Sequence, residues 1–157
     1  MPQSLRSLGV NCFRSCINLD VTLKNGVASL GKANIYEIKS YAFNSAFKNN
    51  YEKFYFPSSV QSVSNNSFSF IGNTIGQLII GTEDNPSQLD FAKQTSATSI
   101  FAPFQFNANE VNSLIFYTNK YTDFDAEVQV LNGKQTYVRD YFNGFANISG
   151  TREIKHV

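Results

Sequence analysis

The sequence predicts a β-rich repeat solenoid, a stack of short strands and turns with a β-hairpin at its C-terminal end. Two observations lead to this fold class. A spacing of one aliphatic residue, a second three residues on and a Phe five further occurs three times in 157 residues. Between the copies lie short segments with the alternation of β-strands, which end in turn residues. Because one strand and one turn cannot bury an apolar face alone, such copies must stack on each other.

The aliphatic and Phe residues of the three copies form the predicted core. Equivalent residues of successive copies should lie above one another as a ladder of buried side chains, here called rungs. A buried Phe contributes about 1.5–3 kcal/mol, so a Phe ladder would stabilise the whole fold. Rung residues are therefore poor candidates for function. The predicted rungs are Leu5, Leu8, Phe13, Ile35, Ile38, Phe43, Val60, Val63 and Phe68.

Four segments read as short strands because their apolar residues alternate or run together between turn residues. The clearest lies at Phe54–Phe56, where Tyr55 separates two Phe residues. Its counterpart in the first copy is predicted at Leu19–Leu23. Further strands are expected at Leu78–Ile80 and Leu114–Tyr117.

Two stretches interrupt this regular pattern. Val27 and Leu30 have the aliphatic spacing, but no Phe follows five residues later. Either residues 31–34 are an insertion between coils, or Val27–Leu30 is a degenerate repeat of its own. Residues 83–94 predict a short helix, with Asn85 as the N-cap and Pro86 at the first helical position.

The C-terminal part differs in kind. Alternating residues flank Asn132-Gly133, the strongest short hairpin signal, which predicts pairing of Glu127–Leu131 with Lys134–Val138. We expect residues 1–120 to form the solenoid, regular to about residue 80, and residues 121–157 to form its cap.

The other end of the predicted stack is open. Leu5 already occupies a rung, and Met1–Ser4 is too short to cover it. An uncovered coil exposes a strand edge and apolar rungs, which invites edge pairing. Either the chain is a fragment of a longer protein or another chain covers this end, so self-association or a larger assembly through the N-terminal edge is expected.

Composition excludes several classes of function. The net charge is +1 and charged residues make up 16% of the chain, against about 25% in ordinary domains. The basic surface of nucleic-acid-binding proteins is therefore absent. No segment approaches the roughly 20 apolar residues of a membrane span. The N-terminus also lacks the order of a signal peptide, so either the chain is not secreted by that route or a signal was removed.

The residue types that catalysis needs are scarce. His156, the only histidine, lies one residue from the end, which argues against Ser-His-Asp or Cys-His catalysis. Cys12 and Cys16 are expected to be two small buried thiols, with a disulfide between them as the alternative.

Metal and cofactor motifs are equally weak. Asp123, Asp125 and Glu127 alternate as in some calcium loops, but the Gly and bidentate Glu of an EF-hand are missing. No phosphate-binding Gly-rich motif occurs. We therefore predict no metal, no cofactor and no enzymatic activity.

The repeat resembles a known family. The pattern aliphatic-x-x-aliphatic-x-x-x-Ala-Phe-x-x-Cys, followed by a strand that ends in Pro-x-x-Val, is similar to the bacterial leucine-rich repeats of the BspA-like type. Ile35, Ile38, Ala42 and Phe43 match one half; Phe56, Pro57, Ser58, Ser59, Val60, Val63 and Phe68 match the other, and Cys16 falls where that family often has Cys. The resemblance covers about residues 5–80. It implies a curved solenoid that binds proteins or glycans, often at a cell surface, and implies no catalysis.

A second, looser resemblance concerns the segments "IIGTEDNPSQLDF" and "SLIFYT", which are similar to repeat proteins encoded by phages and prophages of gut bacteria. The first resemblance favours a non-catalytic recognition or adhesion module that presents a rigid Asn/Ser/Tyr-rich face to a protein or glycan, on a bacterial or virion surface. The alternative is a purely structural phage virion subunit of the tail, baseplate or head decoration, assembled through its open N-terminal edge.

Tyrosines outside the rungs are the predicted contact residues. Exposed Tyr on a rigid sheet offers a large apolar area with little entropy to lose on binding. Tyr55 must face outward if its two Phe neighbours face the core. The full predicted set is Tyr36, Tyr41, Tyr51, Tyr55, Tyr117 and Tyr121.

Overall fold

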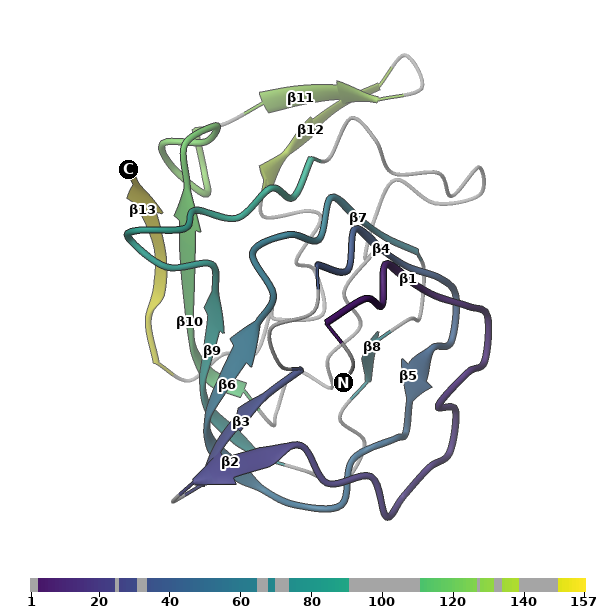
Figure 1. Ribbon diagram of the computed structural model, residues 1–157. Coiled ribbons are helices and arrows are strands. Elements are labelled where there is room, and N and C mark those ends of the chain that lie inside the picture. The colour runs from purple at the N-terminus through teal and green to yellow at the C-terminus, as the bar shows by residue number, and fades with distance from the viewer. Residues whose placement is uncertain are drawn as a thin grey trace.

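The fold is β-rich, with one mostly parallel six-stranded sheet, two smaller parallel sheets and a two-stranded hairpin within the described residues (Figure 1). The computed structural model describes residues 3–24, 26–30, 34–64, 68–69, 74–90, 111–126, 128–131, 134–138 and 150–157. All the elements within these ranges are strands. The predicted β-rich class is therefore confirmed.

The larger sheet has six strands in the order β13-β10-β9-β6-β3-β2. Neighbouring strands are parallel, except that β2 runs antiparallel to β3. The strands are β2 (Thr22–Lys24), β3 (Val27–Ser29), β6 (Tyr51–Phe56), β9 (Ile75–Ile80), β10 (Val111–Thr118) and β13 (Arg152–His156).

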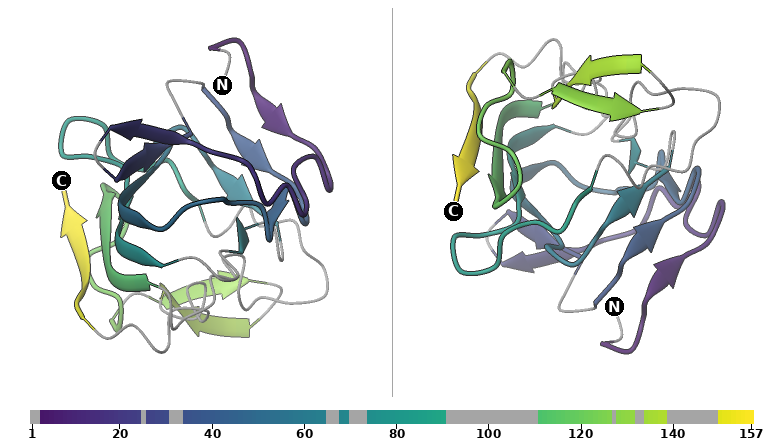
Figure 2. Two further views of the ribbon diagram at one scale, coloured as in Figure 1. Left: turned by 90° about the horizontal axis from the view of Figure 1, so that it is seen from below. Right: turned by 90° about the horizontal axis from the view of Figure 1, so that it is seen from above.

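Two smaller parallel sheets lie on the other side of the molecule (Figures 1 and 2). One has three strands in the order β1-β4-β7, with β1 as an edge strand. The other pairs β5 with β8. These strands are β1 (Ser7–Leu8), β4 (Glu37–Ile38), β5 (Phe43–Asn44), β7 (Ser62–Val63) and β8 (Phe68–Ser69).

The register of pairing follows the sequence repeat on both sides of the molecule. In the three-stranded sheet Ser7 pairs with Glu37, which pairs with Ser62. These steps of 30 and 25 residues are the steps between the predicted Phe rungs. Phe43 likewise pairs with Phe68. Residues 5–30, 35–56 and 60–80 are called the first, second and third repeats below.

The core lies between the sheets. Along the large sheet, Phe54, Leu78 and Leu114 are at one register and are all buried. From the opposite side Ile38 and Phe43 join the same hydrophobic cluster. Strands of only two residues are stable here because their side chains pack into this shared core.

Aromatic stacking connects the repeats. The rings of Phe13 and Phe43, equivalent residues of the first and second repeats, are stacked with their centres 5.4 Å apart. The ring of Phe47 is also stacked on that of Phe43, with the ring centres 5.5 Å apart. Val60 and Val63 are also fully buried, whereas Leu5 is half-buried. The side chain of Phe68 lies outside the described side chains.

The strand of the first repeat lies at a different place from the prediction. The partner of Phe54 is Ala28 in β3, so β3 occupies the position that was predicted for Leu19–Leu23. Leu23 instead falls on the edge strand β2, and its side chain is 65% exposed. Val27–Leu30 therefore supplies the strand of the first repeat rather than a repeat of its own, and residues 31–33 lie outside the described ranges.

The helix predicted over residues 83–94 is wrong for its described part, residues 83–90. Ser87 forms a bridge to Thr118. The backbone N–H of Gln88 donates to the carbonyl of Ser58 at 2.7 Å. Because β10 and the segment after β6 satisfy these backbone groups, no helical hydrogen bonds are needed over residues 87–90.

The C-terminal hairpin is confirmed. β11 (Val128–Leu131) pairs antiparallel with β12 (Lys134–Tyr137), and Leu131 pairs with Lys134 across the turn. The turn residues themselves lie outside the described ranges. The capping role of residues 121–157 and the boundary at residue 120 stay predictions.

Replacing Phe43 by Ala should lower the free energy of unfolding by about 3–5 kcal/mol, because the side chain is fully buried and the cavity leaves two stacked rings without a partner. Urea denaturation followed by circular dichroism measures this. Tyr36→Ala, at a side chain 46% exposed in the same repeat, is the control and should change stability by less than about 0.5 kcal/mol. A Phe43→Ala loss as small as that of the control would exclude Phe43 from the core.

Candidate functional site

The outer face of the large sheet carries an apolar stripe. Because successive side chains of a strand point to opposite faces, the inward direction of Phe54 places Tyr55 outward. Tyr55 is paired in register with Ile79, and Ile79 with Ile115. Adjacent strands lie about 4.7–4.9 Å apart, so the three residues are neighbours in a row across β6, β9 and β10. This row is called the outer stripe.

Polar residues flank the outer stripe. Lys53, Gln77 and Ser113 form the parallel row two residues earlier in the same strands. At the C-terminal edge Glu153 is paired with Lys155, with 3.6 Å between carboxylate oxygen and Nζ. This face therefore carries charges of both signs in small number, and it has no strong electrostatic field.

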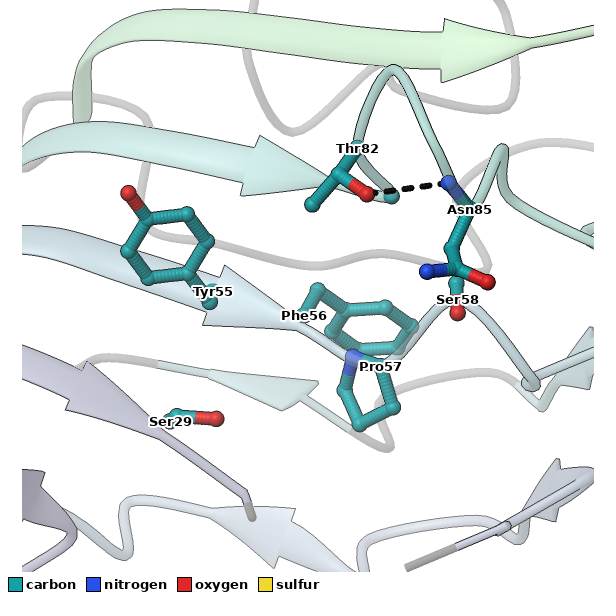
Figure 3. A pocket seen from close by; sticks show the side chains of 8 residues that line it. Ser29, Tyr55, Phe56, Pro57, Ser58, Thr82 and Asn85 are labelled. Carbon is teal, nitrogen blue, oxygen red and sulfur yellow. Dashed lines mark hydrogen bonds between the residues drawn. The ribbon is translucent and has the colours of Figure 1, made fainter. Parts of the chain in front are cut away.

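A hollow of about 170 Å³ opens where β6 and β9 end (Figure 3). Figure 3 shows Tyr55 on one side of it and the turn that carries Thr82 and Asn85 on the other. None of the lining residues is charged at neutral pH. The full lining is Ser29, Tyr55, Phe56, Pro57, Ser58, Gly81, Thr82 and Asn85.

Local sequence explains why the hollow forms at this place. Pro57 follows β6 and cannot donate to a strand ladder, so the strand stops there. Gly81 follows β9 at φ +74°, a conformation that favours glycine. The chain then makes a tight turn in which the Asn85 N–H donates to Thr82 Oγ1 at 3.0 Å and the Thr82 N–H to the Asn85 carbonyl at 2.8 Å.

The predicted contact tyrosines fall into two separate places. Tyr55 lies in the outer stripe, and Tyr117 lies further along the same face, with Lys155 5.8 Å from its ring centre. Tyr36 and Tyr41 belong instead to the side of the three-stranded sheet, where Arg14 lies 4.7 Å from the Tyr41 ring centre. The six tyrosines therefore do not share one face.

Two of the predicted contact residues are corrected, because they are core residues. Tyr51 is 2% exposed and Tyr121 is 3% exposed. The Tyr51 ring packs edge-on against Phe54 at 5.6 Å, and the Tyr121 ring lies 6.1 Å from Phe116. Tyr51 has the strand parity of Tyr55 rather than of Phe54, but at the start of β6 its ring is buried against Phe47 and Phe54.

Burial leaves the Tyr51 hydroxyl in an unfavourable environment. It is buried without a hydrogen-bond partner of ordinary geometry, although the backbones of Val21 and Asn49 lie nearby. Burial disfavours the charged phenolate and raises the pKa of Tyr51 above its ordinary value of 10.0.

The two thiols were expected to be buried, which is wrong. Cys12 and Cys16 are both free and exposed. Partial burial nevertheless raises the pKa of the Cys12 thiol. Their exposure has a structural cause, because the first repeat has a neighbouring repeat on one side only within the described residues.

Asp123, considered above as a calcium ligand, instead stabilises a turn. The Asp123 carboxylate accepts hydrogen bonds from the backbone N–H groups of Asp125 at 2.6 Å and Ala126 at 3.1 Å. Glu127 lies outside the described ranges. Within those ranges no group of three or more His, Cys, Asp or Glu side chains could hold a metal ion. They also contain no helix with the length and apolar character to cross a membrane.

Sequence reasoning missed most of this face. Ile79 and Ile115 were interpreted only as strand residues, and the hollow residues Ser58, Thr82 and Asn85 only as turn residues. The sequence feature that indicated this face was the predicted outward position of Tyr55. The register of the neighbouring strands then places Ile79 and Ile115 beside it.

Compared with protein-family models, with curated proteins and with solved structures, the chain matches none of them. The resemblance to BspA-like repeats therefore stays a prediction.

Removing the Tyr51 hydroxyl by Tyr51→Phe should keep or raise stability at neutral pH, by up to about 1 kcal/mol, because no hydrogen bond is lost. Since the folded pKa is raised, the wild type should lose stability as pH rises above 10.0, where the unfolded side chain ionises more readily. Urea denaturation at neutral pH and about one unit above the ordinary tyrosine pKa measures both effects. A stability difference between variant and wild type that is independent of pH would contradict this assignment.

Replacing Gly81 by Ala should destabilise the fold by about 1–3 kcal/mol, since the residue has a positive φ and an added Cβ would lie 2.6 Å from the Ser87 backbone nitrogen. Gly9→Ala is the matched control, because no atom lies within 4 Å of its added Cβ. Thermal unfolding of both variants tests the difference. Equal melting temperatures would show that the turn bordering the hollow is not constrained in this way.

Proposed function

We propose that the chain is a short leucine-rich-repeat solenoid of the BspA-like type and acts as a non-catalytic recognition or adhesion module. It would present the outer face of its large sheet to a protein or glycan on a bacterial or virion surface. The observation that carries the proposal is the outer stripe, in which half-buried Tyr55 and Ile115 flank Ile79, itself only 7% exposed, on a rigid sheet beside an uncharged hollow.

The solenoid part of the proposal is supported by repeated backbone geometry. Asn11 and Tyr41, equivalent residues 30 apart, have φ values of 60° and 59°. Ser15 and Ser45, also equivalent, have φ values of 57° and 54°. Positive φ is uncommon for residues other than glycine, so its recurrence at both positions indicates the same turn built twice. Together with the repeated register, this favours stacked coils of one type.

The recognition part is supported by the rigidity and chemistry of the outer stripe. Its side chains are held by strands that are paired on both sides, so little conformational entropy is lost when a partner binds. Tyr55 combines a large apolar ring with a hydroxyl, the combination that makes tyrosine frequent in binding surfaces.

The hollow adds polar specificity at one end of the stripe. Ser58, Thr82 and Asn85 offer hydroxyl and amide groups beside the Tyr55 ring. An amide and hydroxyls both donate and accept hydrogen bonds, which suits a neutral partner such as a glycan or a polar protein loop. None of these side chains is an Asp, Glu, His, Lys or Cys, so the proposal assigns no chemical step to the site.

A second candidate is a purely structural subunit of a phage virion, in the tail, baseplate or head decoration. It is favoured by the uncovered first repeat, whose edge strand β1 is available for assembly. The two candidates differ in one measurable respect: only the recognition module requires a partner whose affinity depends on the outer stripe.

The recognition proposal predicts that Tyr55→Ala weakens binding by about 1–2 kcal/mol or more, since a central aromatic contact is removed. Partners are first selected from arrays of bacterial surface glycans and proteins, and affinity is then measured by calorimetry. Tyr36→Ala, on the other side of the molecule, is the matched control and should leave affinity unchanged. Raising salt from about 0.1 to 1 M, which shortens the Debye length from about 10 to 3 Å, should change affinity little. Equal affinities of the two variants, or a steep loss with salt, would reject the site.

A further inference from the structure

We propose that the hollow at the ends of β6 and β9 binds a single neutral pyranose ring at the end of a glycan. This assignment rests on the proposed recognition by the outer stripe and specifies its ligand, a neutral sugar rather than a protein loop or an acidic sugar. Three features of the hollow point to such a ring: the division of apolar and polar groups around it, the rigidity of its walls, and the position of the nearest charges.

One wall of the hollow is aromatic. Figure 3 shows the Tyr55 ring at one side, facing away from the core like the rest of the outer stripe. Tyr55 is half-buried between its register partners Ser29 and Ile79, so its ring is held in place by the sheet. The face of an aromatic ring carries a negative partial charge. The C–H groups on one face of a pyranose carry a positive partial charge and are therefore attracted to it.

The opposite wall is polar and uncharged. It carries the hydroxyls of Ser58 and Thr82 and the side-chain amide of Asn85 (Figure 3). Among the described residues neither the Ser58 hydroxyl nor the Asn85 amide has a hydrogen-bond partner. Thr82 Oγ1 accepts from the Asn85 backbone N–H at 3.0 Å, which leaves its own proton to donate. These groups both donate and accept, as the hydroxyls around a pyranose ring require.

Backbone hydrogen bonds hold the two walls in a fixed relation. The N–H of Gln88 donates to the Ser58 carbonyl at 2.7 Å, which ties the segment after β6 to the segment after β9. The N–H of Ser87 donates to the Tyr117 carbonyl in β10 at 2.8 Å. The polar groups are therefore already in position, and a ligand has little conformational entropy to remove on binding.

Size and composition favour a sugar ring over a protein side chain. A volume of about 170 Å³ is the space of about six water molecules and lies below the range of about 300–1,000 Å³ for drug-sized ligands. An apolar side chain in this space would leave the amide and the hydroxyls without partners, and a charged one would find no opposite charge in the lining. A terminal pyranose brings several hydroxyls on one rigid ring, and the remaining glycan would continue over the outer stripe.

Charges beside the hollow favour a neutral sugar over an acidic one. Glu83 and Asp84 belong to the turn that forms the polar wall, and both are exposed beside the hollow without lining it. They would repel a carboxylate on the sugar, since the Debye length is about 10 Å at 0.1 M salt. Lys53 precedes Tyr55 in β6 and thus lies farther from the strand end at which the hollow opens. Sialic and uronic acids are thereby disfavoured.

The test titrates the full 157-residue chain with the methyl glycosides of glucose, galactose and mannose and follows saturation transfer and amide shifts by NMR. We expect at least one of them to bind in the millimolar range, as small ligands do, and to shift the amide signals around the hollow. Asn85→Ala should weaken this binding about 3–10-fold, because hydrogen bonds to the sugar are lost. Asn18→Ala, at an exposed asparagine outside the hollow, is the matched control and should leave binding unchanged.

Methyl glucuronide tests the preference for a neutral ring, because it differs from methyl glucoside by its carboxylate. If methyl glucoside binds, the glucuronide should bind about threefold more weakly at low salt. The double variant Glu83→Gln/Asp84→Asn should reduce this difference. If Asn85→Ala fails to fold, Ser58→Ala replaces it, since it keeps the backbone carbonyl that Gln88 contacts.

Absence of binding by all three neutral glycosides overturns the sugar assignment, and so does equal binding by Asn85→Ala and Asn18→Ala. If a partner from the arrays then still loses affinity with Tyr55→Ala, recognition by the outer stripe stands and its ligand is a protein. The reverse result, a glycoside that depends on Asn85 while no array partner depends on Tyr55, supports the sugar site and rejects the wider recognition surface.

Discussion

The parallel pairing of equivalent residues in successive repeats is the constraint on which the structure depends. Ser7, Glu37 and Ser62 pair in the three-stranded sheet, while Phe54 pairs with Ala28 and Leu78 in the large sheet. A slip by one residue in either sheet would turn every core side chain toward solvent. Since each repeat contributes to both sheets, the two registers must agree, and this agreement holds strands of two residues in place.

The outer surface follows from the same constraint. Phe54 and Phe56 face the core because their partners in β9 are buried there, and Tyr55 is thereby directed outward. Its register then places Ile79 beside it, although nothing in the local sequence of β9 marks Ile79 as a surface residue. The proposed contact surface is thus a by-product of core packing, and its rigidity has the same origin.

Features that depend on short-range pattern could be predicted from the sequence, and features that depend on distant partners could not. The Asn132-Gly133 hairpin and the outward direction of Tyr55 need only local alternation. Three other features depend on which strand lies alongside. They are the use of β3 rather than Leu19–Leu23 as the strand of the first repeat, the burial of Tyr51, and the bridge that Ser87 forms in place of a helix. Cys12 and Cys16 were expected to be buried although the open N-terminal edge was itself expected, and these two expectations conflict, because small residues on an uncovered repeat must be exposed.

The two edge strands of the large sheet are protected from further strand pairing in different ways. At one end of the large sheet charged side chains on β13 make further strand addition costly, and at the other β2 turns back to occupy the edge of β3. Neither device protects β1. In the same repeat Leu5 and Phe13 are half-buried and both thiols are exposed, whereas Ile35 and Phe43 of the second repeat are fully buried. Burial of equivalent side chains thus falls from the second repeat to the first, which has one neighbouring repeat within the described residues.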